Sequence, residues 1–113
     1  MRLDSIDLSD NTLQLSLDGR LDLEGTQSIE QKFSFAATVR PLNVIVDLSA
    51  VSFLASIGIR MLLTAARAQA SRGGKVILAA PQDSVRKVLE AAGVDQLVPI
   101  THDLDGARAS FAG

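Results

Sequence analysis

Residues 44–60 constrain the fold of this chain more than any other segment. The segment opens with three β-branched residues in a row, Val44, Ile45 and Val46, a run typical of a strand buried on both faces. A short loop follows, and helical periodicity begins after Ser56. We therefore predict a buried strand, a tight loop and a long amphipathic helix, with Ser56 at the position of a helix N-cap.

Ser56 has two interpretations. As an N-cap, its side-chain oxygen would accept a backbone N–H and contribute about 1 kcal/mol to the stability of the helix. As a phosphorylation site, it would present the added phosphate to the free N–H groups and the favourable dipole of a helix N-terminus. The serine by itself favours the cap, because Ser is a preferred N-cap residue in any protein.

The helix that follows has two distinct sides at about 3.6 residues per turn. One side is apolar and is predicted to face the core: Ile59, Leu62, Leu63, Ala66 and Ala70. The other side carries polar residues and an apolar strip: Arg60, Thr64, Arg67 and Ser71, with Ile57, Met61 and Ala68. An apolar strip flanked by Arg and Thr, beside a modifiable serine, favours a partner-binding surface over scattered exposed apolar residues.

Three segments resemble the STAS domain family, specifically the bacterial anti-sigma factor antagonists. Residues 47–59, Asp-Leu-Ser-Ala-Val-Ser-Phe-Leu-Ala-Ser-Ile-Gly-Ile, are similar to the family signature, and residues 19–22, Gly-Arg-Leu-Asp, to its Gly-x-Leu-Asp after the second strand. Residues 89–100 resemble the third helix and last strand. The segments follow the family's order and spacing over nearly the whole chain. The resemblance implies an α/β fold with a STAS-type mixed sheet, an N-terminal antiparallel hairpin and about four helices.

The resemblance also implies a function. Family members bind a serine-kinase anti-sigma factor, which phosphorylates the serine that Ser56 matches. The dephosphorylated form binds the kinase and frees the sigma factor, and phosphorylation breaks that complex. Asp22 would lie in a loop beside the phosphoacceptor, although a loop Asp that makes a local turn is the simpler interpretation. The expected partner-binding residues are Asp22, Ser56, Ile57, Arg60, Met61 and Thr64.

The chain departs from the family pattern on both sides of the serine. Ala55 replaces an acidic residue, which bears on kinase recognition, and Ile57 replaces a small one, which makes the surface more apolar. These departures keep a second function open: a STAS accessory subunit without a phosphorylation switch, such as those of lipid-transport ABC complexes.

Composition limits the other function classes. The 113 residues fit a single domain, residues 1–113, and a net charge of −2 without a basic run argues against nucleic acid as a partner. The absence of cysteine excludes disulfides and cysteine metal sites. No apolar run approaches the roughly 20 residues that span a bilayer, and the first residues lead into a strand pattern rather than a signal segment. We expect a cytoplasmic protein without direct membrane insertion.

The remaining elements follow from periodicity and turn residues. Residues 6–17 predict a two-stranded hairpin around Asp10 and Asn11, and a helix capped by Thr26 is expected to run to about Thr38. The second half alternates strand and helix, which implies parallel pairing through right-handed crossovers. We expect strands at residues 75–80 and 98–100. A helix capped by Asp83 or Ser84 should end at Gly93, and a last helix capped by Asp103 should dock through Phe111.

The sequence offers little for catalysis. Its only histidine, His102, lies in a loop with Asp103 and Asp105, and no spacing brings it to Ser56 as a Ser–His–Asp arrangement would require. No cluster has metal-ligand spacing. We therefore expect a protein that is not an enzyme, needs no cofactor or metal, and is a monomer or a weak dimer through its hairpin edge.

Overall fold

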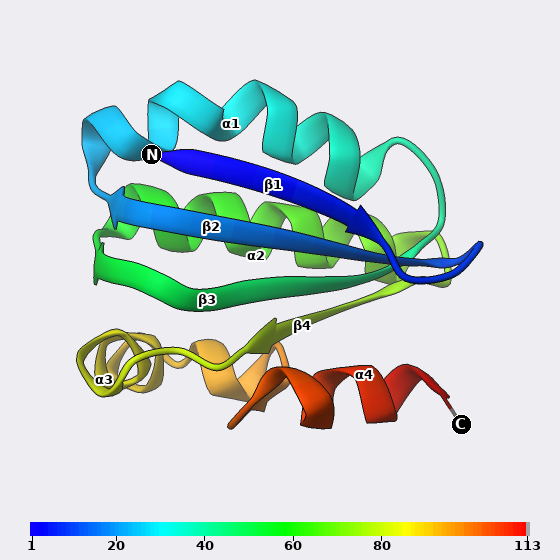
Figure 1. Cartoon of the computed structure of the whole chain (residues 1–113). Coiled ribbons are helices and arrows are strands. Elements are labelled where there is room, and N and C mark those ends of the chain that lie inside the picture. The colour runs from blue at the N-terminus through cyan, green and yellow to red at the C-terminus, as the bar shows by residue number, and fades with distance from the viewer. Residues whose placement is uncertain (113) are drawn as a thin grey trace.

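The computed structural model describes residues 1–112 and shows one mixed, five-stranded sheet with helices on both faces (Figure 1). The strands are β1 (Arg2–Asp7), β2 (Thr12–Leu21), β3 (Asn43–Leu54), β4 (Lys75–Ala79) and β5 (Ile100–Thr101). Their order in the sheet is the order in the chain. β1 pairs with β2 in antiparallel fashion and the other neighbours are parallel, which confirms the predicted N-terminal hairpin and mixed sheet.

Four α-helices connect or follow these strands, as expected: α1 (Leu23–Thr38), α2 (Ser56–Ser71), α3 (Asp83–Ala91) and α4 (Leu104–Ala112). A short 3₁₀ turn, η1 (Val94–Gln96), lies between α3 and β5. No helix among the described residues combines the length and apolar character needed to cross a membrane.

Alternation along the central strands divides the core into two parts. The larger part joins β2, β3 and β4 to α1, α2 and α3; its members include Leu15, Val44, Val46, Leu78, Phe33, Leu62 and Leu89. The smaller part lies on the other side of the sheet, where Ile45 and Ile77 pack against Ala107 of α4. We call this second side the α4 face. Phe111 packs there as well, partly buried, which confirms its predicted docking role.

β3 is longer than the sequence predicted, and the expected tight loop before the helix does not exist. The strand continues through Leu54, and its pairing with β2 shifts register twice, between Ser16 and Asp18 and between Gly19 and Arg20. Each shift inserts one extra residue in β3, which is a β-bulge. Residues 19–21, predicted as a loop, also belong to a strand, the end of β2.

Several predicted helix starts are corrected. α1 begins at Leu23 with Asp22 as its N-cap, so Thr26 lies inside the helix, where it is fully buried. Neither Asp83 nor Ser84 caps α3, because Gln82 holds that position without a side-chain cap bond. Asp103 does cap α4, accepting the Gly106 N–H at 2.7 Å.

The last strand is also shifted, to Ile100–Thr101 from the predicted residues 98–100. Pro99 has no N–H to donate to a ladder, and Val98 is instead bonded back to the carbonyl of Val94 in η1.

A buried glutamine fastens the far end of α2. Gln69 is fully buried, and its amide nitrogen donates to the carbonyl oxygens of Ala37, at 2.5 Å, and Arg40, at 2.9 Å. Its amide oxygen accepts the Leu42 N–H at 2.9 Å. One side chain thereby satisfies three backbone groups in the segment that connects α1 to β3.

Candidate functional site at the β3–α2 junction

A single residue, Ala55, separates β3 from α2. Its N–H donates to the carbonyl of Leu21 at 2.9 Å, and its own carbonyl accepts from Gly58 and Ile59 at 3.0 and 3.1 Å. Ala55 is therefore the N-cap, without a side-chain cap bond, and Ser56 is the first helical residue. The prediction that Ser56 caps the helix is wrong by one position. Its exposed side chain is left to face solvent at the start of α2.

Gly58 allows the first turn of α2 to lie directly on the ends of β2 and β3. A Cβ atom at this position would lie 2.9 Å from Leu54 Cδ1 and 3.0 Å from Leu21 Cβ, closer than side chains normally approach. The glycine thus fixes how near Ser56 lies to the end of β2.

Asp22 lies at the same end of the sheet, one residue after the Leu21 carbonyl that binds Ala55. Its Oδ1 accepts the Gly25 N–H at 2.8 Å, and its Oδ2 faces Arg20 Nε at 3.4 Å. The Gly25 hydrogen bond is the largest effect and holds the pKa of the Asp22 carboxyl below its usual value. Desolvation opposes it, and the hydrogen bond and charge of Arg20 lower the pKa further by smaller amounts. Asp22 is therefore a charged helix cap at this end of the sheet, rather than part of a free loop.

Arg20 and Phe53 form a contact that the sequence did not indicate. They are register partners on β2 and β3, and the Arg20 guanidinium lies 4.3 Å from the centroid of the Phe53 ring. Phe53 is 41% exposed. A β-bulge lies just before this pair and interrupts the alternation of the strands. A search for period-two alternation in the sequence therefore does not show that the two residues face each other.

Five exposed or half-exposed residues therefore surround the junction. We call them the junction surface: Arg20, Asp22, Phe53, Ser56 and Arg60. Arg60 belongs to it because it lies one helical turn after Ser56, on the same side of α2. The surface combines an aromatic ring, two guanidinium groups, one carboxylate and one hydroxyl.

The predicted exposed strip on α2 is only partly correct. Met61 is 4% exposed and packs in the main core, so its placement on the outer side is wrong, and Ile57 is half-buried. Thr64 is exposed, two turns beyond Ser56, and its hydroxyl donates to the Arg60 carbonyl at 2.8 Å. Met61 forms part of a shallow groove between α1 and α2, lined by Glu30, Gln31, Ser34, Arg60, Met61 and Thr64.

The reason is that the buried stripe of α2 is rotated from the predicted one. It consists of Gly58, Met61, Leu62, Ala65 and Gln69, whereas Ala70, predicted to be buried, is exposed. A glycine and a glutamine hold two of the five buried positions. Because neither residue is a large apolar one, the helical periodicity of apolar residues did not predict that these two positions are buried.

His102 and Ser56 lie apart. His102 directly follows β5, next to the end of β4. β3 runs on past its last pair with β4, Asp47 with Ala79, for residues 48–54, or about 20 Å, before Ser56 is reached. Among residues 1–112, no three His, Cys, Asp or Glu side chains gather in a way that could hold a metal ion.

Known proteins and one family model are similar to this chain over most of its length. The model of the STAS domain matches residues 5–107. BtrV of Bordetella bronchiseptica, named as a candidate anti-sigma factor antagonist, is 23% identical over 107 residues, which cover 95% of this chain and 92% of BtrV.

Solved structures are similar over most of the chain. The anti-sigma factor antagonist SpoIIAA in its unphosphorylated form shares 25% identity, with a TM-score of 0.74 over 88% of this chain and 87% of that one. The phosphorylated form of SpoIIAA from Bacillus is 24% identical, with a TM-score of 0.68 over 88% and 90%. An anti-sigma factor antagonist from Mycobacterium paratuberculosis is 24% identical, with a TM-score of 0.88 over 99% and 94%. Because the family model matches residues 5–107, which is most of the sequence, this chain belongs to the STAS domain family.

Proposed function

We propose that this chain is an anti-sigma factor antagonist that binds a serine-kinase anti-sigma factor through the junction surface and is released when Ser56 is phosphorylated. The observation that carries the proposal is the exposed Ser56 side chain, placed at the start of α2 and outside the N-cap position, in a STAS domain. The names of the similar proteins support the same role. This role is regulatory and cytoplasmic, and it requires no catalytic residue or cofactor of the chain itself.

The position of Ser56 suits reversible modification. A kinase can reach an exposed hydroxyl at the first helical residue without opening the helix. A phosphate there meets the positive end of the α2 dipole, and no acidic residue occupies the first turn of α2 to oppose it. Phosphorylation of Ser56 is therefore compatible with the fold, and we expect it to change partner binding at the junction surface rather than the stability of α2.

The charges of the junction surface explain how a phosphate would release a partner. Arg20 is already engaged by the Asp22 carboxylate and the Phe53 ring. A phosphate on Ser56 adds about −1.5 to −2 charges near Asp22, which already carries a negative charge at neutral pH. Burying this excess negative charge against a partner that fits the unmodified surface costs several kcal/mol.

The decisive experiment uses the purified chain with a purified serine-kinase anti-sigma factor from the same genome. With ATP, we expect one phosphoryl group, mapped to Ser56 by fragment mass spectrometry, and none on Ser56→Ala. In binding measurements, Ser56→Asp should weaken the complex at least about 100-fold, whereas Ser56→Ala should bind like the unmodified protein.

Ser84→Asp is the matched control, because it adds an acid to the first turn of α3, where Ser84 is also exposed. It should leave binding unchanged. Equal binding of Ser56→Asp and wild type would reject the switch. It would instead favour the accessory-subunit function, in which the fold binds a partner regardless of Ser56.

A further inference from the structure

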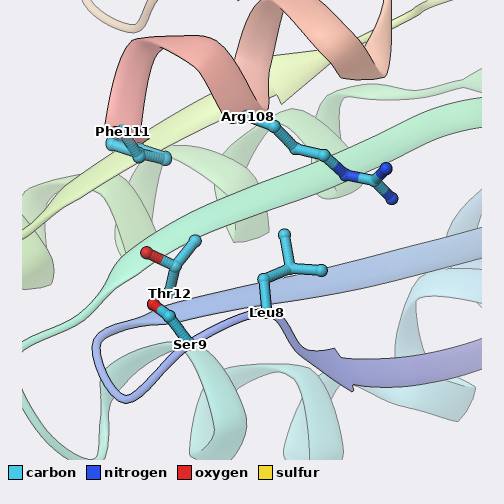
Figure 2. Close-up of a pocket in the computed structure, with 5 residues that line it drawn as sticks. All are labelled: Leu8, Ser9, Thr12, Arg108 and Phe111. Atoms are coloured by element: carbon cyan, nitrogen blue, oxygen red, sulfur yellow. The ribbon is translucent and has the colours of Figure 1, made fainter. Parts of the chain in front are cut away.

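Figure 2 shows a pocket of about 370 Å³ that no part of the junction surface lines. Its lining residues come from the turn after β1, the start of β2 and α4: Leu8, Ser9, Thr12, Arg108 and Phe111. Thr12 begins β2 and Leu21 ends it, so the length of the strand, about 30 Å, separates this pocket from the Ala55–Ser56 step. Nothing in the proposed switch uses these residues.

A series of hydrogen-bonded polar side chains on the α4 face positions the Arg108 guanidinium in this pocket. Arg108 Nη2 donates to Gln14 Oε1 at 2.9 Å, and Gln14 Nε2 donates to Ser16 Oγ at 3.2 Å. Ser16 in turn donates to Asp47 Oδ2 at 3.2 Å. Gln14 and Asp47 are 3% and 9% exposed, so the base of this series is held within the sheet. Because Ser16 takes the amide nitrogen, the amide oxygen of Gln14 faces Arg108 and positions its guanidinium.

Arg108 keeps most of its capacity for an anion. The ion pairs found among residues 1–112 involve Arg2, Arg20 and Arg86, and none of them includes Arg108. Its side chain is exposed, and Gln14 occupies one of its several N–H donors. The guanidinium is thus a pre-positioned fork of the kind that binds a carboxylate in a bidentate manner.

The walls of the pocket are apolar on two sides. Phe111 is partly buried against Ile45, Ile77 and Ala107, and Leu8 is 36% exposed. Figure 2 shows the Leu8 side chain pointing from its loop toward α4. In this view Phe111 lies above Thr12, and the Arg108 side chain extends away from Phe111. The hydroxyl-bearing residues Ser9 and Thr12 complete the lining.

From this combination we propose that the pocket binds a small carboxylate with an apolar tail. The carboxylate pairs with Arg108, and the tail packs between Leu8 and Phe111. The volume lies at the low end of the range for small-molecule sites, so a ligand of few atoms with a Kd of about 1 mM is expected.

Three probes test the proposal by NMR on the ¹⁵N-labelled chain at constant ionic strength: hexanoate, acetate and hexylammonium. Hexanoate should shift the amides of Ser9 and Thr12 and the Nε–H of Arg108 in a saturable way. Acetate, which lacks the tail, should bind about tenfold more weakly, and hexylammonium should not bind. Saturable binding of hexylammonium at the same residues, or shifts by hexanoate that never saturate, would overturn the proposal.

Variants locate the two halves of the ligand. Arg108→Gln should weaken hexanoate about tenfold, and Leu8→Ala about threefold, while the matched control Arg67→Gln, at an exposed position on α2, should have no effect. If Arg108→Gln disturbs the resonances of α4 itself, Arg108→Lys retains the charge and should bind hexanoate a few-fold more weakly than wild type. Unchanged affinity in Arg108→Gln would exclude the assigned cation.

Discussion

At the scale of single residues, polar side chains that bond to the backbone do much to place the site. Gln69 satisfies three backbone groups at the far end of α2, while Asp22 caps α1 beside the junction. Thr26, predicted as a cap, is a fully buried residue whose hydroxyl has no hydrogen-bond partner among the described residues. The role of Gln69 depends on backbone groups 27 to 32 positions away, so residue type and spacing do not reveal it.

Gln69→Ala should destabilise the protein by about 3–5 kcal/mol. The substitution leaves the N–H of Leu42 and the carbonyls of Ala37 and Arg40 without their partner, and it opens a cavity. The free energy of unfolding can be followed by circular dichroism in urea, since the chain has no Trp or Tyr for fluorescence. Gln27→Ala, at an exposed position on α1, serves as control and should stay within about 0.5 kcal/mol of wild type.

Asp22 makes stability depend on pH in the acid range. Its folded-state pKa lies below the unfolded value of about 3.9, so its charged form stabilises the fold above that pH. This contribution is lost as pH falls through the lower folded-state pKa. Asp22→Asn should therefore flatten the acid limb of the stability curve below about pH 4, measured by urea unfolding at several pH values. An acid limb identical to that of wild type would contradict the assignment.

At the scale of elements, the sequence predicted the order of strands and helices but misread how β3 ends. Its buried positions beyond Asp47 are Leu48, Val51 and Leu54, at intervals of three, because two bulges interrupt the alternation. An interval of three is not a strand pattern, so this stretch was predicted to be a loop. The hairpin and the buried run 44–46 keep regular alternation or a continuous apolar pattern, and both were predicted correctly.

The cost of a Gly→Ala substitution, in free energy of unfolding, should depend at three positions on the space left for a methyl group. A Cβ on Gly25 would lie 1.8 Å from the Arg20 carbonyl oxygen, and one on Gly58 2.9 Å from Leu54 Cδ1. On Gly106 the nearest atom is an exposed Asp103 oxygen at 3.1 Å. We expect Gly25→Ala to cost at least about 3 kcal/mol and Gly58→Ala about 1–2 kcal/mol, with Gly106→Ala near zero. A different order in urea unfolding would show that these approaches do not limit packing.

At the scale of the whole molecule, the two proposed surfaces lie at opposite ends of β2 and should act independently. Ser56→Asp places a negative charge at the positive end of α2, so unfolding should require the same free energy as in wild type or about 0.3–1 kcal/mol more. Its affinity for hexanoate should be unchanged. A large loss of stability would mean that any loss of partner binding reflects unfolding rather than charge.

The family and the whole-chain arrangement followed from three short motifs, whereas the pocket on the α4 face did not. Its residues lie in two widely separated parts of the sequence, and Arg108 reaches Gln14 across 94 positions. No local pattern connects such partners. The same limit applies to Arg20 and Phe53, whose contact depends on the bulged register of two strands.

The strands follow the same order in the sheet as in the chain, and this order has a consequence for folding during synthesis. Each new strand can pair with the one made just before it, so the sheet can grow from one edge to the other as the chain emerges. α4 is made after all five strands, and its Arg108 bond to Gln14 returns to β2. In a ribosome-bound chain, Ile45 and Ile77 therefore stay uncovered until α4 has emerged, and apolar surface exposed in this interval favours aggregation.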